Sequence, residues 1–288
     1  ILAQVLFCMS DLKWGLWSPS DKAWYDAWLS KVGEQLPEVR TQGEIVIPQI
    51  LHHIWVGPKT IPEKCSGWMD GWKRMHQDWQ HMLWTDAKVA ELGMGQDPRY
   101  QAALKRSPAE ASDILRLKIL AEHGGVYVDV DFECIKPFDD LTRQYSFFTG
   151  MSNVGAVEVN NGLIGAAPGH PLTLRLLELV GKPWPEWGGP DVDPAQAAAH
   201  VMAQQMPELA AVLAGGEAAP FIATTGPGFF TRCVMRHSMS SWESDVAILP
   251  AQYFYPLRNS DRGNKDAVAA AAAAPDTLAI HHWCRTWE

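Results

Sequence analysis

The stretch of sequence that decides the fold is SPAEASDILRLKILAEHGGVYVDVDFEC, residues 107–134. A capping-box pattern opens it: Ser107 is followed by a proline at the first helical position and, three residues after the cap, by Glu110. The predicted helix should end at Gly124 and Gly125, because glycine adopts the left-handed conformation that terminates helices. The alternating, β-branched VYVDVDF that follows predicts a strand, so helix, tight turn and strand form one continuous unit.

Strands and helices alternate on both sides of this unit. Upstream, residues 45–57 (IVIPQILHHIWVG) predict a buried strand, a helix follows with Trp68, Trp72 and Met75 on one face, and residues 81–84 predict a short strand. Downstream the pattern is less periodic: after NNGLIGA at 160–166, helices are predicted at 171–180 and 195–205, and an alanine run at 267–274 is expected in a surface loop or helix. This alternation predicts an α/β fold with a mainly parallel sheet flanked by helices.

The composition excludes several classes of protein. A length of 288 residues fits two domains of ordinary size or one large α/β domain. Apolar residues make up 47% of the chain and charged residues 20%, which excludes a disordered or fibrous protein. The net charge of −9 argues against non-specific binding to a phosphate backbone, so we expect no nucleic-acid partner. The 14 tryptophans, nine of them before Asp86, point to a stacking or carbohydrate surface as well as to the core.

Residues 1–43 are predicted to form an N-terminal helical extension. Cap-type residues precede Trp24 and Trp28, which lie four residues apart, so residues 18–36 predict an amphipathic helix. Residues 1–9 (ILAQVLFCM) are either the tail of a removed signal or membrane anchor, or a short buried segment. No apolar run in the sequence approaches the roughly 18 residues that a membrane-spanning helix needs.

Asp129 and Asp131 stand at the end of the predicted strand, where open α/β sheets bind their ligands. Alternate residues of a continuing strand share one face, so both carboxylates should reach one ion while Val130 points the other way. Carboxylate oxygens suit Mg²⁺ or Mn²⁺ and leave coordination positions for phosphate. The alternative is a solvated pair of acids at a strand end.

Two further groups are candidates for the same site. Asp113 and Arg116 lie three residues apart on a largely apolar helix, so we expect them to share a face that lines a cleft, with a plain ion pair as the alternative. Near the C-terminus, AIHHW at 279–283 predicts a short strand that delivers an imidazole acceptable to Mn²⁺. His281 is the expected ligand, and His282 takes its place if the strand register differs by one residue.

Four blocks of the sequence, in order and spacing, resemble the DXD-containing sugar-transferase family: IPQILHHIWVG, ASDILRLKILAEHGGVYVDVDFECIKPF, NNGLIGAAPGHP and AIHHWCRTW. That family includes initiating α-1,6-mannosyltransferases, mannosyl-inositol-phosphoceramide synthases and capsular-polysaccharide glycosyltransferases. The resemblance covers residues 45–287. It implies a GT-A type, Rossmann-like fold, a nucleotide-sugar donor, a divalent ion that is usually Mn²⁺, and transfer with retention of anomeric configuration.

The resemblance also implies roles for individual residues. Asp113 and Arg116 match the pair that binds the donor sugar. Asp129 would contact the ribose or the sugar and help to hold the metal, Asp131 would be the principal metal ligand, and His281 would face metal and diphosphate.

Four more residues are expected to bind substrate. By the resemblance, Trp55 would lie near the nucleobase, Asn161 beside the sugar, and Trp283 in the C-terminal motif. Thr225, in a turn with paired hydroxyls, would border the acceptor site or belong to an ordinary strand-to-helix turn. Where the family commonly has a serine before the last tryptophan, this chain has Thr286, whose hydroxyl could substitute in a phosphate contact.

We therefore expect one glycosyltransferase catalytic domain over 44–288. The expected reaction moves a hexose, with mannose favoured, from GDP-mannose or else a UDP-hexose to a glycan or glycolipid such as an inositol phosphoceramide. The family favours a Golgi membrane or lumen, with membrane association through an N-terminal segment, and the cytoplasm is the alternative. Rival functions are a catalytically inactive carbohydrate-binding relative and an aspartate-based phosphotransferase, but the latter needs a hydroxyl residue where Glu133 stands.

Overall fold

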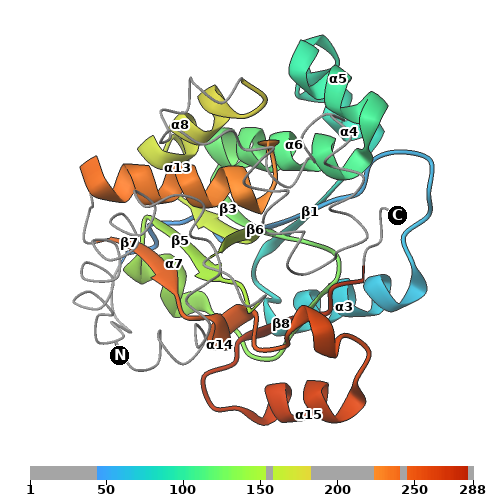
Figure 1. Ribbon diagram of the computed structural model, residues 1–288, viewed down its shortest axis with the longest axis vertical. Coiled ribbons are helices and arrows are strands. Elements are labelled where there is room, and N and C mark those ends of the chain that lie inside the picture. The colour runs from blue at the N-terminus through green and yellow to red at the C-terminus, as the bar shows by residue number, and fades with distance from the viewer. Residues whose placement is uncertain (1–43, 154–157, 183–223, 241–244, 285–288) are drawn as a thin grey trace, which may run out of the picture.

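The computed structural model describes residues 44–153, 158–182, 224–240 and 245–284 (Figure 1). The helices expected at 18–36 and 195–205 lie outside the described residues. The strands and helices that position the site, in chain order, are β1 (Ile50–Ile54), α3 (Glu63–Met75), β2 (Gln80–Trp84), α4 (Asp86–Glu91), α5 (Pro98–Arg106), α6 (Pro108–His123), β3 (Gly125–Val128), β4 (Phe132–Cys134), α7 (Asp139–Gln144), β5 (Phe147–Met151), β6 (Val159–Ala166), α8 (Pro171–Leu179), α13 (Pro227–Ser240), β7 (Val246–Leu249), α14 (Ala251–Phe254), α15 (Lys265–Ala273) and β8 (Ala279–His281).

The central sheet has six strands in the order β2-β1-β3-β6-β5-β7. Within it, β6 runs antiparallel to both of its neighbours, and the other neighbouring pairs are parallel. Helices α6, α8 and α13 lie on one side of this sheet, and α3, α7 and α14 lie on the other (Figure 1). The expected class, a mixed but mainly parallel Rossmann-like sheet flanked by helices, is confirmed.

Helix α6 begins and ends as its sequence predicts. The side chain of Ser107 accepts a hydrogen bond from the backbone N–H of Ala109 at 3.2 Å. Glu110 does not complete the capping box, because its carboxylate pairs with Arg106 instead (Nε to Oε2, 2.9 Å). The helix ends at Gly124, whose φ of 63° is left-handed and where a Cβ would lie 2.6 Å from the ring of Pro168. Only glycine fits this turn into β3.

The prediction for α3 needs one correction. Its buried face consists of Cys65, Met69 and Trp72, and Trp68 lies at the edge of that face. Met75, which was expected on the buried face, is 42% exposed. The buried face continues at His76, the C-cap residue, which is buried, so Met75 falls outside that face.

The prediction of one continuous strand through Phe132 was wrong. β3 stops at Val128, the chain turns, and Phe132 begins β4, which pairs with β8 in a separate two-stranded sheet. The backbone N–H of Asp129 donates to Gly162 O at 2.8 Å, and Phe132 N–H then donates back to Asp129 O at 3.2 Å, closing the turn. The two carboxylates are therefore presented by a turn at the sheet edge and not by the pleat of a strand.

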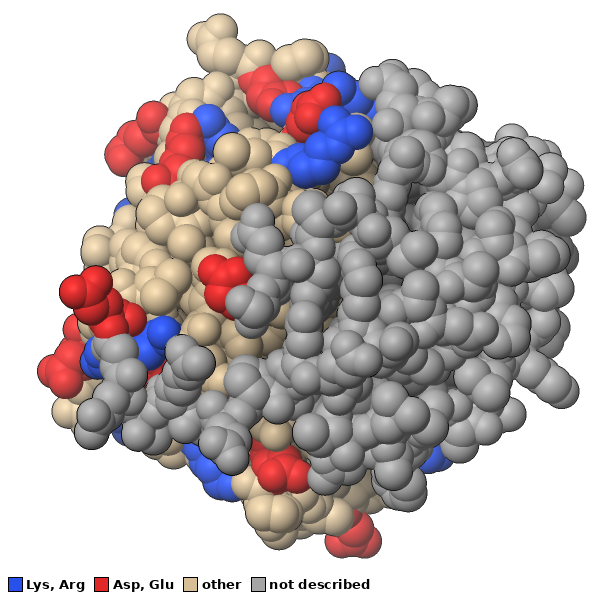
Figure 2. Space-filling model, turned by 90° about the vertical axis from the view of Figure 1, so that its left-hand side faces the viewer, with Lys and Arg blue, Asp and Glu red and all other residues tan. Residues whose placement is uncertain are grey.

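The core lies on both faces of the central sheet. Leu51 of β1, Val126 of β3 and Ile164 of β6 are fully buried, as are Leu115 and Leu120 of α6. On the described surface visible in Figure 2, basic and acidic side chains lie interspersed. Within the described ranges, no helix combines the length and the apolar character needed to cross a membrane.

Candidate active site

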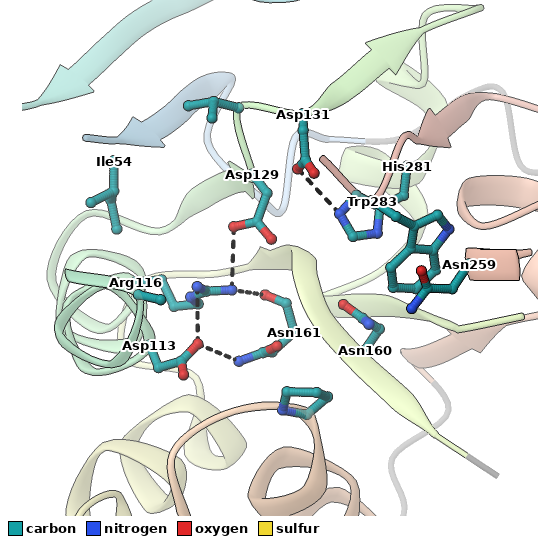
Figure 3. A pocket seen from close by; sticks show the side chains of 13 residues that line it. Ile54, Asp113, Arg116, Asp129, Asp131, Asn160, Asn161, Asn259, His281 and Trp283 are labelled. Carbon is teal, nitrogen blue, oxygen red and sulfur yellow. Dashed lines mark hydrogen bonds and ion pairs between the residues drawn. The ribbon is translucent and has the colours of Figure 1, made fainter. Parts of the chain in front are cut away.

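A cavity of about 230 Å³ opens where β3 ends (Figure 3). Its lining comes from β1, α6, the turn after β3, β6, the start of α13, Asn259, and β8 with the segment that follows it. Asp113 and Arg116 lie at one end of it, His281 and Trp283 lie at the other, and Asp129 lies between them (Figure 3). The fold therefore gathers into one cavity charged residues as far apart in the chain as Asp113 and His281.

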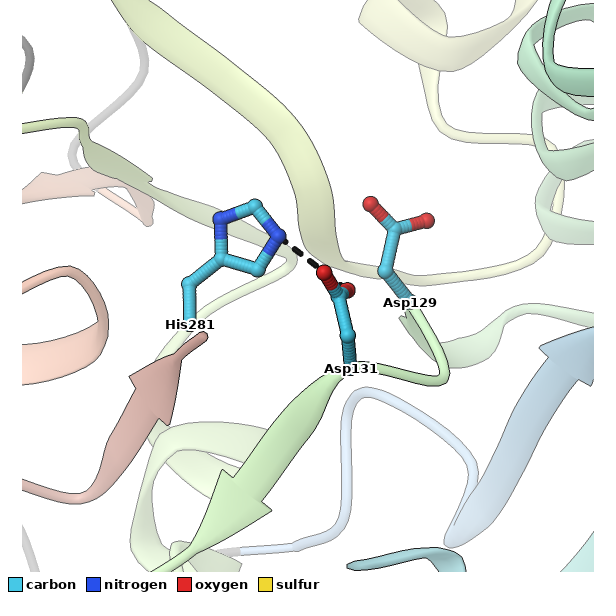
Figure 4. A group of neighbouring side chains, drawn as sticks. All are labelled: Asp129, Asp131 and His281. Atoms are coloured by element: carbon cyan, nitrogen blue, oxygen red, sulfur yellow. Dashed lines mark hydrogen bonds and ion pairs between the residues drawn. The ribbon is translucent and has the colours of Figure 1, made fainter. Parts of the chain in front are cut away.

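Asp129, Asp131 and His281 each offer one ligand atom, and these atoms lie within 4.8 Å of one another (Figure 4). The pairing of β4 with β8 produces this arrangement, since it sets Phe132 opposite His281. The ring of His281 stacks on that of Phe132, and its Nε2 lies 3.1 Å from Asp131 Oδ1. His282 points elsewhere: its Nε2 contacts Glu133 Oε2 at 2.9 Å. Of the two candidate histidines, His281 therefore joins the carboxylates.

The charges of Asp131 and His281 stabilise each other. Burial raises the pKa of Asp131, but His281 and the backbone N–H of Cys284 outweigh burial and hold the pKa below its ordinary value. Burial lowers the pKa of His281, but Asp131 outweighs that effect and raises it. Asp131 and His281 therefore form a buried ion pair beside Asp129.

The donor set fits a hard divalent ion. The two carboxylates suit Mn²⁺ or Mg²⁺, and the imidazole beside them, with no thiolate in the group, is acceptable to Mn²⁺. The imidazole nitrogen that faces the carboxylates is Nε2, which lies 3.1 Å from Asp131 Oδ1 (Figure 4).

Arg116 is the positive charge that the chain itself supplies to the cavity. Its Nη2 lies 3.0 Å from Asp113 Oδ1 and its Nη1 lies 3.5 Å from Asp129 Oδ1. Nη1 also donates to the backbone oxygen of Asn161 at 2.6 Å, and the guanidinium lies over the ring of Tyr127 at 4.5 Å. Asp113 and Arg116 are each only 4% exposed, which makes them a buried pair and not a solvated i, i+3 pair.

Both carboxylate oxygens of Asp113 are engaged. Oδ1 accepts from Asn161 Nδ2 at 2.9 Å and faces Arg116, and Oδ2 accepts from Thr225 Oγ1 at 3.0 Å. Burial raises the pKa of Asp113 to about 6, against the opposing pull of Arg116. Asp113 therefore anchors Arg116 and Asn161 and has no free oxygen.

Three residues that the sequence did not single out complete the polar network. Tyr127, in β3, donates a short hydrogen bond from its hydroxyl to Asp129, in the turn that follows the strand. Tyr255 donates to Asn160 Oδ1 at 3.1 Å, and Asn160 lines the cavity beside Asn161. The alternation of residues 126–129 was a local signal for Tyr127, which stands two positions before Asp129, whereas nothing local pointed to Tyr255.

Position 162 has no room for a side chain, because Asp129 lies close to it. A Cβ on Gly162 would lie 2.7 Å from Asp129 Oδ2 and 3.0 Å from Asn160 Oδ1. We expect Gly162→Ala to displace Asp129 and to reduce turnover about tenfold or more, with about 1–3 kcal/mol of lost stability. Steady-state kinetics and thermal denaturation measure the two effects.

Gly67→Ala is the matched control, because a Cβ at that position in α3 meets nothing within 4 Å. Alanine is the better helix former, so this variant should keep its activity and melt no lower than the parent protein. Equal activity of the two variants would contradict the close-approach argument.

Trp55 and Thr225 do not line the cavity. Trp55 is 6% exposed and packs with Cys65, Met69 and Val130, while its Nε1 donates to the backbone oxygen of Lys59 at 2.6 Å. The neighbouring residue of β1 that does reach the cavity is Ile54. Thr225 contributes through Asp113 and not through the lining.

Trp283 does line the cavity and is held in a strained conformation. Its φ of 55° is left-handed, which is rare for a bulky residue and costs on the order of 1–3 kcal/mol. Its Nε1 donates to Leu257 O at 2.9 Å, and its ring lies 4.1 Å from that of His281. Strain held by the surrounding packing points to a functional position for this ring.

Comparison with known proteins finds similarity to glycosyltransferases. The family model described as "Glycosyltransferase sugar-binding region containing DXD motif" matches residues 62–148. Inositol phosphoceramide mannosyltransferase 3 of Schizosaccharomyces pombe is 30% identical over 142 residues, which cover 49% of this chain and 39% of that protein. The mannosyl phosphorylinositol ceramide synthase SUR1 of Saccharomyces cerevisiae is 31% identical over 138 residues, covering 46% of this chain and 34% of that protein.

The matched regions thus span well under half the length of these relatives. Among solved structures, the PaToxG glycosyltransferase superimposes with a TM-score of 0.46 at 19% identity, covering 75% of each chain. The UDP-bound glycosyltransferase domain from the YGT toxin gives a TM-score of 0.47 at 12% identity, covering 71% of this chain and 80% of that one. Residues 62–148, the segment that matches the family model, carry Asp113, Arg116, Asp129 and Asp131, so the match falls on the family that the sequence motifs resemble.

Proposed function

We propose that this protein is a metal-dependent, retaining glycosyltransferase that moves a hexose from a nucleotide-sugar donor to a carbohydrate-containing acceptor. The observation that carries the proposal is the convergence of Asp129, Asp131 and His281 within 4.8 Å, in the same cavity as the buried Arg116. Metal ligands and a fixed cation in one cavity suit a substrate whose leaving group is a diphosphate.

In this proposal Asp129, Asp131 and His281 hold Mn²⁺ or Mg²⁺. A divalent cation bound there supplies positive charge that attracts the donor diphosphate and stabilises the negative charge that develops on it. Tyr127 and Cys284 orient the two carboxylates through hydrogen bonds to Asp129 and Asp131. Such supporting hydrogen bonds fix the direction in which each ligand oxygen points.

Arg116, Asp113 and Asn161 form the proposed sugar-binding end of the cavity. The guanidinium is fixed by Asp113 and by the backbone oxygen of Asn161, so its charge is preorganised before substrate arrives. Asn160, held by Tyr255, presents its amide to the same cavity. Rigid hydrogen-bonding groups of this kind set the orientation of a sugar ring.

In this proposal the acceptor attacks the sugar on the face from which the diphosphate leaves, because the carboxylates of the described cavity lining are already engaged. In the described lining, both oxygens of Asp113 are engaged, and Asp129 and Asp131 belong to the proposed metal site. None of these three is therefore a free nucleophile for a double displacement. In the proposed step the bond from C1 to the phosphate oxygen breaks, the acceptor oxygen bonds to C1, and its proton passes to that phosphate oxygen. A covalent sugar trapped on a carboxylate would contradict this route.

Mannose is the favoured sugar, because the named relatives are a mannosyltransferase and a mannosyl phosphorylinositol ceramide synthase. GDP-mannose is thus the first donor to test, followed by UDP-glucose and UDP-galactose. A glycan or a glycolipid such as inositol phosphoceramide is the proposed acceptor. The proposed location is the secretory pathway, at a Golgi membrane or in its lumen, and the cytoplasm is the alternative.

Thermal denaturation with nucleotide and metal tests the donor site. We expect GDP or UDP to raise the melting temperature with Mn²⁺ and to have little effect with EDTA, because the diphosphate binds through the cation. If neither nucleotide stabilises the protein in a metal-dependent way, the proposal fails. If nucleotide binds but no nucleotide sugar is hydrolysed or transferred, the protein is an inactive carbohydrate-binding relative.

A further inference from the structure

A second cavity, of about 780 Å³, lies on the other side of Trp283 from the candidate active site. Its lining residues come from the first turns of α3, from β4, from α15 and the two residues Arg262 and Gly263 before it, and from the segment that follows β8. Trp283 lines both cavities, so the two cavities are neighbours that share this residue. We call the second cavity the Trp68 pocket, after the aromatic residue of α3 that lines it.

The Trp68 pocket concentrates positive charge in a chain whose net charge is −9. Lys64, Arg262 and Lys265 line it. Among the ion pairs of the described residues, none includes any of these three cations. Among the described residues of the lining, Glu133 is the acid, and its Oε2 lies 2.9 Å from His282 Nε2. Three cations and one carboxylate leave this lining with an excess of positive charge, which suits an anionic ligand.

The pocket also has a rigid aromatic surface. The indole of Trp68 stacks on the ring of His282 with centroids 4.0 Å apart and an interplanar angle of 13°. Lys64 lies 4.7 Å from the centre of the same indole. Val268 and Ala272 of α15 line the pocket with apolar atoms. An aromatic face beside cations and small apolar groups suits a sugar or polyol ring that carries an anionic group.

We infer that the Trp68 pocket is the acceptor subsite and binds a polyol or sugar that carries a phosphate group. The inference rests on the proposed glycosyltransfer function, because it places an acceptor hydroxyl beside Trp283 and the proposed metal site. Arg262 is suited to the phosphate, since guanidinium binds phosphate oxygens in pairs. Its Nη1 contacts Asn259 Oδ1 at 3.4 Å, and Asn259 itself lines the first cavity. The phosphate contact is thus linked directly to the wall of the active site.

Binding measurements with simple probes test this inference. The double variant R262Q/K265Q removes two charges from the pocket, and R175Q/K73Q removes two exposed charges elsewhere. By titration calorimetry with Mn²⁺ and GDP present, myo-inositol 1-phosphate should bind the pocket variant about tenfold or more weakly than it binds the control variant. Neutral myo-inositol should bind both variants alike, and inorganic phosphate should bind the parent protein more weakly than inositol phosphate does.

Vesicles distinguish a lipid headgroup from a soluble phosphate. Phosphatidylcholine vesicles that contain inositol phosphoceramide should bind the parent protein better than phosphatidylcholine alone if the phosphate belongs to a lipid headgroup. The two kinds of vesicle should bind equally if the acceptor is soluble.

Equal loss of inositol phosphate binding in both double variants, or no loss in either, overturns the inference. Loss of the metal-dependent GDP shift in R262Q/K265Q also overturns it, because the pocket would then serve the donor. A parent protein that shows no nucleotide shift at all contradicts the proposed function instead.

Discussion

Replacing Asp131 with asparagine is expected to reduce turnover at least about a thousandfold while leaving the fold intact. The change removes one negative charge from the proposed metal site and keeps the shape of the side chain. Asparagine still offers an oxygen to the backbone N–H of Cys284, which donates to Asp131 at 2.8 Å. It can no longer pair with a charged His281, which faces the other oxygen at 3.1 Å. Metal affinity should fall because the proposed ligand set loses one of its two carboxylates.

The measurement combines sugar-transfer or nucleotide-sugar hydrolysis rates across a range of Mn²⁺ concentrations with circular dichroism. Asp97→Asn is the matched control, because Asp97 is also a hydrogen-bonded carboxylate but caps α5 outside the cavity. Asparagine caps helices as well as aspartate does, so the control should keep full activity. An Asp131→Asn protein that turns over at the parent rate without added metal would contradict the proposed role of this residue.

Replacing Arg116 with lysine is expected to reduce turnover at least about a hundredfold, although the positive charge is retained. The planar guanidinium serves Asp113, Asp129 and the backbone oxygen of Asn161 at once. A single ammonium group cannot reach all three positions, so the negative charges of Asp113 and Asp129 are less well balanced inside a buried site. Leaving buried charges incompletely paired costs about 3–5 kcal/mol, which should also lower the melting temperature.

Arg106→Lys is the control for this substitution. Arg106 pairs with Glu110 outside the cavity; its own side chain is 60% exposed and that of Glu110 is 7% exposed. Lysine keeps the charge that pairs with Glu110 but loses one of the two hydrogen bonds, so the control should keep the parent rate and lose only about 1 kcal/mol of stability. The Arg116→Lys protein should retain metal-dependent GDP stabilisation, since the proposed metal ligands are unchanged. If its rate equals that of Arg106→Lys, then Arg116 has no specific part in the reaction.

Local sequence signals predicted the elements that build the site. The serine cap, the proline and the two glycines specified α6 and its turn into β3, because each acts through the backbone of its nearest neighbours. The same stretch placed Asp113, Arg116, Asp129 and Asp131 at the positions from which they meet. Two details failed for local reasons: Glu110 found a stronger partner in Arg106, and the chain turned at Asp129 where alternation predicted a longer strand.

Other features depended on contacts between distant parts of the chain. The choice of His281 over His282 follows from the register of β8 on β4, which joins segments about 150 positions apart. Tyr255 and the tight space around Gly162 likewise exist only once β6 lies beside β3. Trp55 was expected near the cavity, but packing turned its ring toward α3. Nothing in the sequence near these residues carries that information.

The sequence by itself thus determined the α/β class, the helix and turn before the acidic pair, and the residue types of a hard-metal site. Capping, glycine conformation and alternation act within a few residues, so they can be read directly from the chain. The tertiary structure alone decided which histidine joins the carboxylates, how Arg116 is fixed, and that three cations surround a second cavity beyond Trp283. These features arise from the packing of distant segments, which places side chains according to shape and charge and not according to sequence separation.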